Sequence, residues 1–459
     1  MNFQQLQNSK TLSLTRSRRR FLGFGLTAYL GSAFASKHSF GDEIEELPPG
    51  VTPSNPRELL YPTPEPSKKL FTPESGSYVA SYPMLQNVSE NSATVAWALN
   101  VPSTGWVEWG TTPSLGKIAR NSEFGLNPYE SNFLSARLTG LLPNTKYYYR
   151  TVTCSFNYRS AYDKSISAPQ YSEIYSFTTV GPNVDKVSFA VMNDTHNQVN
   201  TVAKHCQRHK ELNADVVFWN GDVCHRYFFP LIAKTAIANP CDIPYAAERP
   251  IVFIPGNHDK WGPYAHSLKE CLTPWKQNSS QFYSLGYNAA FRLGPIAMVT
   301  LDTGDPKPDS TKKHQGIASF EPYRELQASW LEYVLSRPEI GGAPYLITFC
   351  HVPLFNPFDD DKEPTLPLKW KAYEPNSAKL WAPILEKHNI TLMISAHLHR
   401  FAYSEKTDVR PWPQLLGGGP LMTNATCIHA EADSNSLTVY SEKLEDQSVQ
   451  GVWTFKPRV

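Results

Sequence analysis

Short apolar runs alternate with polar turns between residues 76 and 180. Residues 92–99 and 106–109 are two such runs, rich in the β-branched and aromatic side chains that favour strands. Residues 138–150 read as a Leu-Pro-Asn corner followed by a strand that starts with consecutive tyrosines, and we expect a buried tyrosine hydroxyl to tie this corner to the backbone just upstream. With residues 176–179 as a last strand, the pattern predicts an all-β sandwich over 76–180.

The pattern changes after Gly181-Pro182, where apolar runs are separated by longer segments, as in an α/β domain over 181–459. Five runs are each followed by Asp, His or Asn: residues 187–192, 216–219, 251–254, 345–349 and 391–394. Ligands bind at the carboxyl ends of strands in open α/β sheets, so the sequence predicts a site there. Residues 435–456 alternate again and are expected to add terminal strands.

Composition narrows the class of protein. Lys+Arg is 43 and Asp+Glu is 42 in 459 residues, so the net charge of +1 gives no broad basic field and we expect no nucleic-acid partner. No apolar run reaches the ~18 residues of a spanning helix, so we expect no transmembrane segment in the mature chain. The 7 cysteines include no CxxC pair, which argues against a disulfide framework or a zinc knuckle, although one or two disulfides remain open.

The first 35 residues have the features of an export signal. Arg16, Arg18, Arg19 and Arg20 precede a short, mildly apolar stretch, and Ala33-Phe34-Ala35 matches the small-x-small cleavage rule. The arginines resemble a bacterial twin-arginine signal; the alternative is a Sec signal or an N-terminal anchor. We therefore expect an exported, periplasmic or extracellular protein, in which a Pro-rich lead-in over 36–75 precedes the sandwich.

Potential metal ligands follow the predicted strands in order. They are Asp194, His196, Asp222, Asn257, His351, His397 and His399. Asp-x-His alone is common, whereas Gly-Asn-His-Asp at 256–259 is rare. Asp194, Asp222 and Asn257 are each separated by roughly 30 residues, the length of one strand–helix–strand unit, so successive parallel strands would bring them to one edge. His397 and His399 point the same way on an extended segment.

In this order, the residues resemble the calcineurin-like metallophosphoesterase superfamily over roughly 185–430. The preceding sandwich, which resembles a fibronectin type III domain, makes the purple acid phosphatases the nearest group. The resemblance implies an α/β metallophosphoesterase domain, a β-sandwich flanked by helices that holds two metal ions. It also implies that Asp194, His196 and His399 bind one ion, that Asn257, His351 and His397 bind the other, and that Asp222 bridges them. Iron, manganese and zinc all suit such ligands.

The chain departs from the purple acid phosphatase pattern at three positions. His225 stands where that family has a tyrosine whose charge transfer to ferric iron gives the colour, so we expect a colourless protein. His196 replaces a glycine at the end of the first motif, and Ala396 replaces the glycine before His397.

The predicted function is that of an exported di-metal phosphohydrolase, acid phosphatase-like, which cleaves small phosphomonoesters by in-line attack of a metal-bridging hydroxide. His258 is the expected acid for the leaving oxygen, oriented by Asp259, while Asn257 and Arg226 hold the phosphate. The alternatives are a phosphodiesterase acting on nucleotides or phospholipid head groups and, less favoured, a non-catalytic binding protein. Aromatic residues after the motifs either line a cleft or belong to the core: Tyr227, Phe228, Phe229, Trp261, Tyr264 and Trp275.

Overall fold

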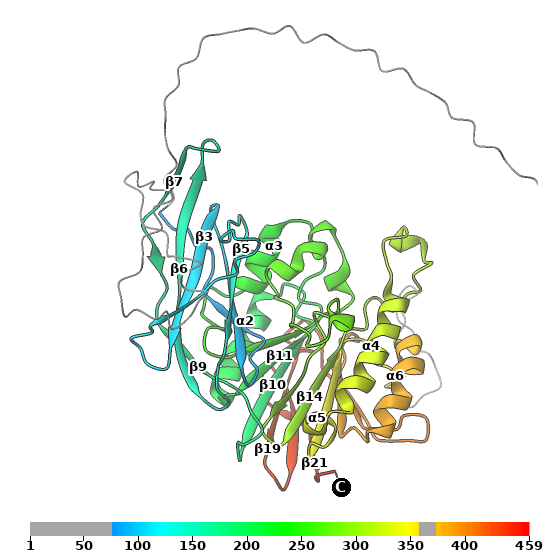
Figure 1. Ribbon diagram of the computed structural model, residues 1–459. Coiled ribbons are helices and arrows are strands. Elements are labelled where there is room, and N and C mark those ends of the chain that lie inside the picture. The colour runs from blue at the N-terminus through cyan, green and yellow to red at the C-terminus, as the bar shows by residue number, and fades with distance from the viewer. Residues whose placement is uncertain (1–75, 358–372, 459) are drawn as a thin grey trace, which may run out of the picture. The chain divides into compact units, whose positions relative to one another are not determined.

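The computed structural model describes residues 76–357 and 373–458, and two facing sheets form the centre of this part of the chain (Figure 1). The first sheet has nine strands in the order β21 (Val449–Phe455), β20 (Leu437–Lys443), β19 (Thr426–Ala432), β10 (Val187–Asn193), β11 (Val216–Asn220), β12 (Ile251–Ile254), β1 (Met84–Gln86), β2 (Ser92–Ala98) and β5 (Phe133–Thr139). The second has six, in the order β13 (Ala290–Leu293), β14 (Ile296–Leu301), β15 (Tyr345–Cys350), β16 (Leu392–Ser395), β18 (Gln414–Leu416) and β17 (Ala402–Ser404).

The five apolar runs of the α/β region are strands, as predicted. They form β10, β11 and β12, which are parallel neighbours in the first sheet, and β15 and β16, which are parallel neighbours in the second. The chain's last strands, β20 and β21, extend the first sheet antiparallel to β19, which confirms the expectation for residues 435–456.

Aromatic and aliphatic side chains fill the space between the two sheets. Phe218 of the first sheet stacks on Phe349 of the second with ring centroids 4.1 Å apart, and Phe189 meets Phe349 edge-on. The side chains in this layer are mainly apolar because the strands alternate faces and the inner face cannot reach water. Burying each of these phenylalanines contributes about 1.5–3 kcal/mol, so this layer holds the two sheets together.

Helices cover the outer face of each sheet. On the first sheet, α2 (Val199–Leu212) and α3 (Pro230–Ala233) pack against residues such as Trp219 and Phe253. On the second, α4 (Phe320–Leu335), α5 (Pro338–Gly341) and α6 (Pro375–Lys387) cover Val299 and Met393, and Figure 1 shows α4 and α6 running side by side. The predicted sandwich flanked by helices is confirmed. Within the described residues, no helix combines the length and apolar character needed to cross a membrane.

The N-terminal region is all-β, as predicted. Its own sheet runs β4 (Lys117–Ala119), β3 (Ser103–Gly110), β6 (Lys146–Tyr158) and β7 (Lys164–Ile166), with β8 (Gln170–Tyr171) and β9 (Tyr175–Thr178) also paired to β6. The expected tyrosine corner is present: the Leu142 amide donates to the Tyr147 hydroxyl over 2.9 Å.

The N-terminal region also supplies three strands of the nine-stranded sheet, a feature that the sequence pattern did not show. β1 is antiparallel to β2 and parallel to β12, with Gln86 opposite Ile251. The Gln86 amide nitrogen donates to the Cys271 carbonyl, and the Tyr149 hydroxyl donates to the buried Ala247 carbonyl over 2.5 Å. Without β1, β12 would be an edge strand with unpaired backbone groups. Residues 76–180 therefore complete the sheet that carries the site described below.

We predict that Tyr149→Phe destabilises the protein by about 1–3 kcal/mol, because the Ala247 carbonyl would stay buried without its donor. Urea unfolding of the full chain measures this. The control is Tyr148→Phe, on the opposite face of the same strand and half-buried, which we expect to change stability by less than about 0.5 kcal/mol. Equal effects of the two variants would contradict a tie between the two regions at Tyr149.

Candidate metal centre

Seven predicted ligands meet at one edge of the two sheets. Asp194, Asp222 and Asn257 follow the parallel strands β10, β11 and β12. His351 follows β15, while His397 and His399 follow β16 of the other sheet. Since the layer between the sheets aligns their carboxyl ends, loops far apart in sequence converge there.

The side chains form two groups that share one member. Asp194, His196, Asp222 and His399 make one group, and Asp222, His351 and His397 make the other; within each, the ligand atoms all lie within 4.8 Å of one another. Such spacing suits a cation bound at ~2.0–2.2 Å by each ligand. For these six residues the grouping agrees with the division implied by the family resemblance, in which Asp222 would bridge the two ions.

Several ligand atoms lie close enough to one another to bind a common cation. The Nε2 atoms of His196 and His399 are 3.0 Å apart, and Asp222 Oδ2 lies 3.2 Å from His351 Nε2. Three buried atoms have no hydrogen-bond partner: Asp194 Oδ1, Asn257 Oδ1 and His351 Nε2. Leaving such atoms unpaired costs about 1–3 kcal/mol each, and two cations would satisfy all three. The residues therefore fit a two-metal centre.

The protein holds each carboxylate by its other oxygen. Asp194 Oδ2 accepts hydrogen bonds from the Asn193 side chain and the His397 amide, at 2.8 and 2.9 Å. Asp222 Oδ1 accepts from the His258 amide over 2.8 Å. Contacts of this kind orient the free oxygen toward a metal and fix the geometry before the metal binds.

The backbone is strained where these ligands sit. Asp194, His196, Asp222, His397 and His399 all have positive φ angles, between 41° and 75°. Gly221 precedes Asp222 with φ +76°, and a Cβ there would strike the His351 ring and the Gly256 backbone. Non-glycine residues adopt this region at a cost, and such positions cluster at functional sites.

Without bound metal, the carboxylates and imidazoles shift each other's pKa values. Burial lowers the pKa of His351, but the Asp222 and Asp194 carboxylates outweigh it and raise the pKa to about 10. Burial raises the pKa of Asp222, but His351, His258 and His196 hold it below its usual range. His351 therefore carries a proton at neutral pH until a cation displaces it, so metal binding releases protons and strengthens as the pH rises.

His258 lies beside the metal ligands without belonging to either group. It begins a single helical turn, η2 (His258–Lys260), and its Nε2 is 3.9 Å from Asp222 Oδ2. Its Nδ1 is 3.1 Å from the His225 carbonyl oxygen, and its ring lies 4.0 Å from that of Trp261. With Nδ1–H donating to that carbonyl, Nε2 is left to exchange a proton with a bound molecule.

The expectation that Asp259 orients His258 is wrong. The Asp259 carboxylate instead accepts hydrogen bonds from the Asp222 and Gly256 amides, both at 2.8 Å, and from the Tyr227 hydroxyl at 2.9 Å. Burial, joined by the Asp222 charge, raises the pKa of Asp259 to about 7. Asp259 therefore holds the loops after β11 and β12 together, while a backbone carbonyl takes the orienting role.

His225 occupies the position where purple acid phosphatases are expected to have tyrosine, and it reaches the centre. Its Nδ1 is 3.2 Å from His196 Nδ1, and His196, His225 and His258 form a further group of close ligand atoms. The neighbouring Tyr227 hydroxyl is engaged by Asp259.

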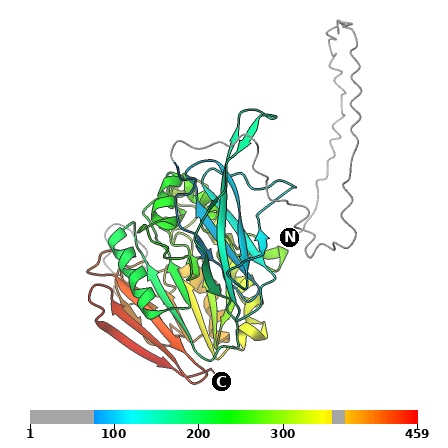
Figure 2. The same ribbon diagram turned by 90° about the vertical axis from the view of Figure 1, so that its left-hand side faces the viewer.

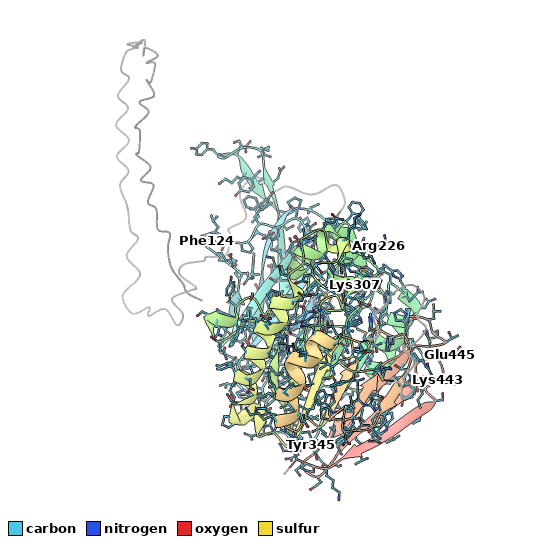
Figure 3. The ribbon with its side chains drawn as sticks, turned by 90° about the vertical axis from the view of Figure 1, so that its right-hand side faces the viewer. Phe124, Arg226, Lys307, Tyr345, Lys443 and Glu445 are labelled. Carbon is cyan, nitrogen blue, oxygen red and sulfur yellow. The ribbon has the colours of Figure 1, made fainter. Side chains whose placement is uncertain are left out.

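A cavity of ≈ 740 Å³ is lined by Trp261, whose ring contacts that of His258. Trp261 and Arg226 line it together with Lys260, Lys313 and His314. Arg226 is exposed, and Figure 3 shows it on the same side of the molecule as Lys307, which lies 5.5 Å from the Trp261 ring centroid and pairs with Asp305. The sequence analysis did not identify Lys260, Lys313 or His314 as site residues. Lys313 and His314 reach the cavity from the loop between β14 and α4, and a loop has no periodic sequence pattern that would indicate this position.

The six aromatic residues that follow the motifs divide between the two readings. Trp261 lines the cavity, whereas Tyr227 and Tyr264 are buried and Trp275 stacks on Phe291 of the core. Phe228 and Phe229 are exposed. Gly417–Gly419 lie beside the metal centre, since the Gly418 carbonyl accepts from Asn193 and a Cβ on Gly419 would strike His399.

We predict that Asp222→Asn lowers the metal content of the purified, dialysed protein to less than one ion per chain, because it removes the only carboxylate common to both groups. Elemental analysis measures this. The control is Asp215→Asn, which lies at the other end of β11 and bonds Ser188. Full retention of two ions by Asp222→Asn would contradict a bridging role.

Comparisons with known proteins agree with this geometry. Residues 187–401 match the family model of the calcineurin-like phosphoesterases, and residues 82–179 match that of the purple acid phosphatase N-terminal domain. Among solved structures, a purple acid phosphatase from yellow lupin (Lupinus luteus) seeds is similar, with 15% identity, a TM-score of 0.58, and coverage of 82% of this chain and 74% of that one. The structure of PhoD has 12% identity, a TM-score of 0.54, and coverage of 84% and 94%.

A search of curated proteins gave no match. The two family models nevertheless cover the region that builds the centre and the strands that complete its sheet. The chain thus joins a purple acid phosphatase N-terminal domain to a calcineurin-like phosphoesterase domain, and it is a metal-dependent hydrolase of the metallophosphoesterase family.

Proposed function

We propose that the chain hydrolyses small phosphomonoesters, with His258 donating a proton to the leaving oxygen. The observation that carries this proposal is the position of His258. Its Nε2 lies 3.9 Å from the shared carboxylate, its Nδ1 is held by the His225 carbonyl, and its ring contacts Trp261, which lines the cavity.

Two metal ions, when bound, supply a water of lowered pKa and hold the phosphoryl oxygens. The chain's own residues do the rest. Asp222 holds both ions in register, and Asn257 offers a neutral oxygen that adds no further negative charge near an anionic substrate. As the bond from phosphorus to the leaving oxygen breaks, His258 in its imidazolium form transfers its Nε2 proton to that oxygen and keeps the Nδ1 hydrogen bonded to the His225 carbonyl.

Charge in the cavity favours a monoester over a diester. Lys260 and Lys307 are neutralised by Asp302 and Asp305. Arg226 and Lys313 take part in none of the ion pairs among the described residues, so they leave positive charge in the cavity beside Trp261. A phosphomonoester dianion gains more from that charge than a diester monoanion does. Turnover of p-nitrophenyl phosphate against bis-p-nitrophenyl phosphate, with manganese or zinc, tests this preference.

We predict that His258→Ala lowers kcat by about 10²–10⁴ on an alkyl phosphate and by much less on p-nitrophenyl phosphate, whose leaving group departs without a proton. Metal content should be unchanged because His258 is not a ligand. His388→Ala, at the end of α6, is the control and should match the wild type on both substrates. Equal losses on both leaving groups would remove the acid role of His258.

We further propose export through the twin-arginine route, supported by Arg18 and Arg19 ahead of a mildly apolar stretch and by Ala33-Phe34-Ala35. These residues lie outside the part of the chain that the structure describes. We predict that Arg18→Lys with Arg19→Lys retains folded, active enzyme in the cytoplasm, as measured by phosphatase activity in cell fractions. Arg16→Lys, outside the pair, should be exported normally. Unchanged export of the double variant would favour the Sec route.

A further inference from the structure

A second group of metal-ligating side chains lies outside the phosphoesterase centre. His205, His209 and Cys427 place one ligand atom each within 4.8 Å of the others. All three are buried, with exposed fractions of 1%, 3% and 0% for His205, His209 and Cys427's side chain. None of the seven ligands of the first centre belongs to this group.

The three residues come from two elements that pack against each other. His205 and His209 are one turn apart on the buried face of α2, with ring centroids 5.5 Å apart, and Cys427 is in β19. Arg208 of the same helix pairs with Glu442 of β20, which lies directly opposite Cys427 in the strand register. Figure 2 shows α2 alongside the C-terminal strands, and Figure 3 labels Lys443 at the end of β20.

Each imidazole has a buried nitrogen with nothing to bind. His205 Nδ1 and His209 Nε2 have no hydrogen-bond partner in the described structure. Core histidines are ordinarily satisfied by a backbone carbonyl or a carboxylate. The Glu442 carboxylate, on the residue opposite Cys427, is already occupied by Arg208 and by His429 Nε2 at 3.0 Å. A cation between the two rings would satisfy both nitrogens at once.

Two of the three groups are already in the form that binds a cation, whereas the thiol would have to lose its proton. Burial lowers the pKa of His205 to about 3 and that of His209 well below its usual range, so both imidazoles are neutral, as a metal requires. Burial and the Glu442 charge raise the pKa of the Cys427 thiol to about 12, while the nearby Arg208 works the other way. A bound divalent cation would displace the thiol proton and stabilise the thiolate.

We propose that His205, His209 and Cys427 bind a zinc ion that fastens α2 to β19. Two imidazoles and a thiolate form a ligand set that zinc prefers over the harder cations. The ion would have a structural role. α2 begins three residues after His196, and the Thr201 hydroxyl of this helix donates to the Pro420 carbonyl beside the glycine turn. By holding α2, the ion steadies two loops of the phosphoesterase centre without contacting the substrate.

Cobalt substitution separates the two centres because only the second contains sulfur. Full-length protein is stripped of metal, reloaded with Co²⁺, and examined in the near-ultraviolet for a thiolate-to-cobalt charge-transfer band. We expect the band in the wild type, its loss in Cys427→Ser, and its retention in Cys271→Ser, a control at an equally buried thiol in a different cluster. Zinc analysis should show about one equivalent fewer in Cys427→Ser than in the control.

Absence of the band from cobalt-loaded wild type would overturn the proposal, and this measurement does not depend on the folding of any variant. Persistence of the band in Cys427→Ser would place the metal at another thiol and overturn it as well. His209→Gln provides a second variant: it should lose the same equivalent of zinc while the ligands of the first centre stay intact.

Discussion

The Asp222 carboxylate is the point on which the two halves of the metal centre depend. It is buried, it belongs to both ligand groups, and it is held from behind by the His258 amide. Its charge is offset by imidazoles from both sheets, with His196 on one side and His351 on the other. Bound cations would complete the coordination of this buried carboxylate, so metal binding and the convergence of the two sheets would stabilise the same arrangement.

This arrangement also explains why the backbone carries unusual conformations at the site. Positive φ angles at five ligands turn the chain sharply as each strand ends, which allows two side chains from one short loop to reach neighbouring ions. Two features offset the free-energy cost of these conformations. The apolar layer around Phe218 and Phe349 fixes the strand ends. The Asp259 carboxylate accepts hydrogen bonds from the loops after β11 and β12. The scaffold is therefore rigid where the ligands are strained.

The N-terminal domain belongs to the same physical unit. β1 lies between β2 and β12, so the sheet that presents Asn257 continues into residues 84–139. At the opposite edge, β19 continues the sheet toward the C-terminus and packs with α2, where His205, His209 and Cys427 meet. The first centre is thus flanked on both sides by segments that the phosphoesterase family model does not include in full.

The strands that carry the ligands could be predicted without the structure, because apolar runs of four to six residues followed by Asp, Asn or His leave little choice of structure. The sequence also indicated the ligand partition, through a motif order shared with a known family. It could not show that Gln86 pairs with Ile251, since β-strand pairing depends on contacts far apart in the chain. The prediction that Asp259 orients His258 was wrong, because the Asp259 carboxylate accepts hydrogen bonds from the Asp222 and Gly256 amides instead. Two further features were not indicated by the sequence, the cavity residues Lys313 and His314 and the group at Cys427. Both depend on residues that are distant in sequence lying close together in the fold, and no local sequence pattern indicates such proximity.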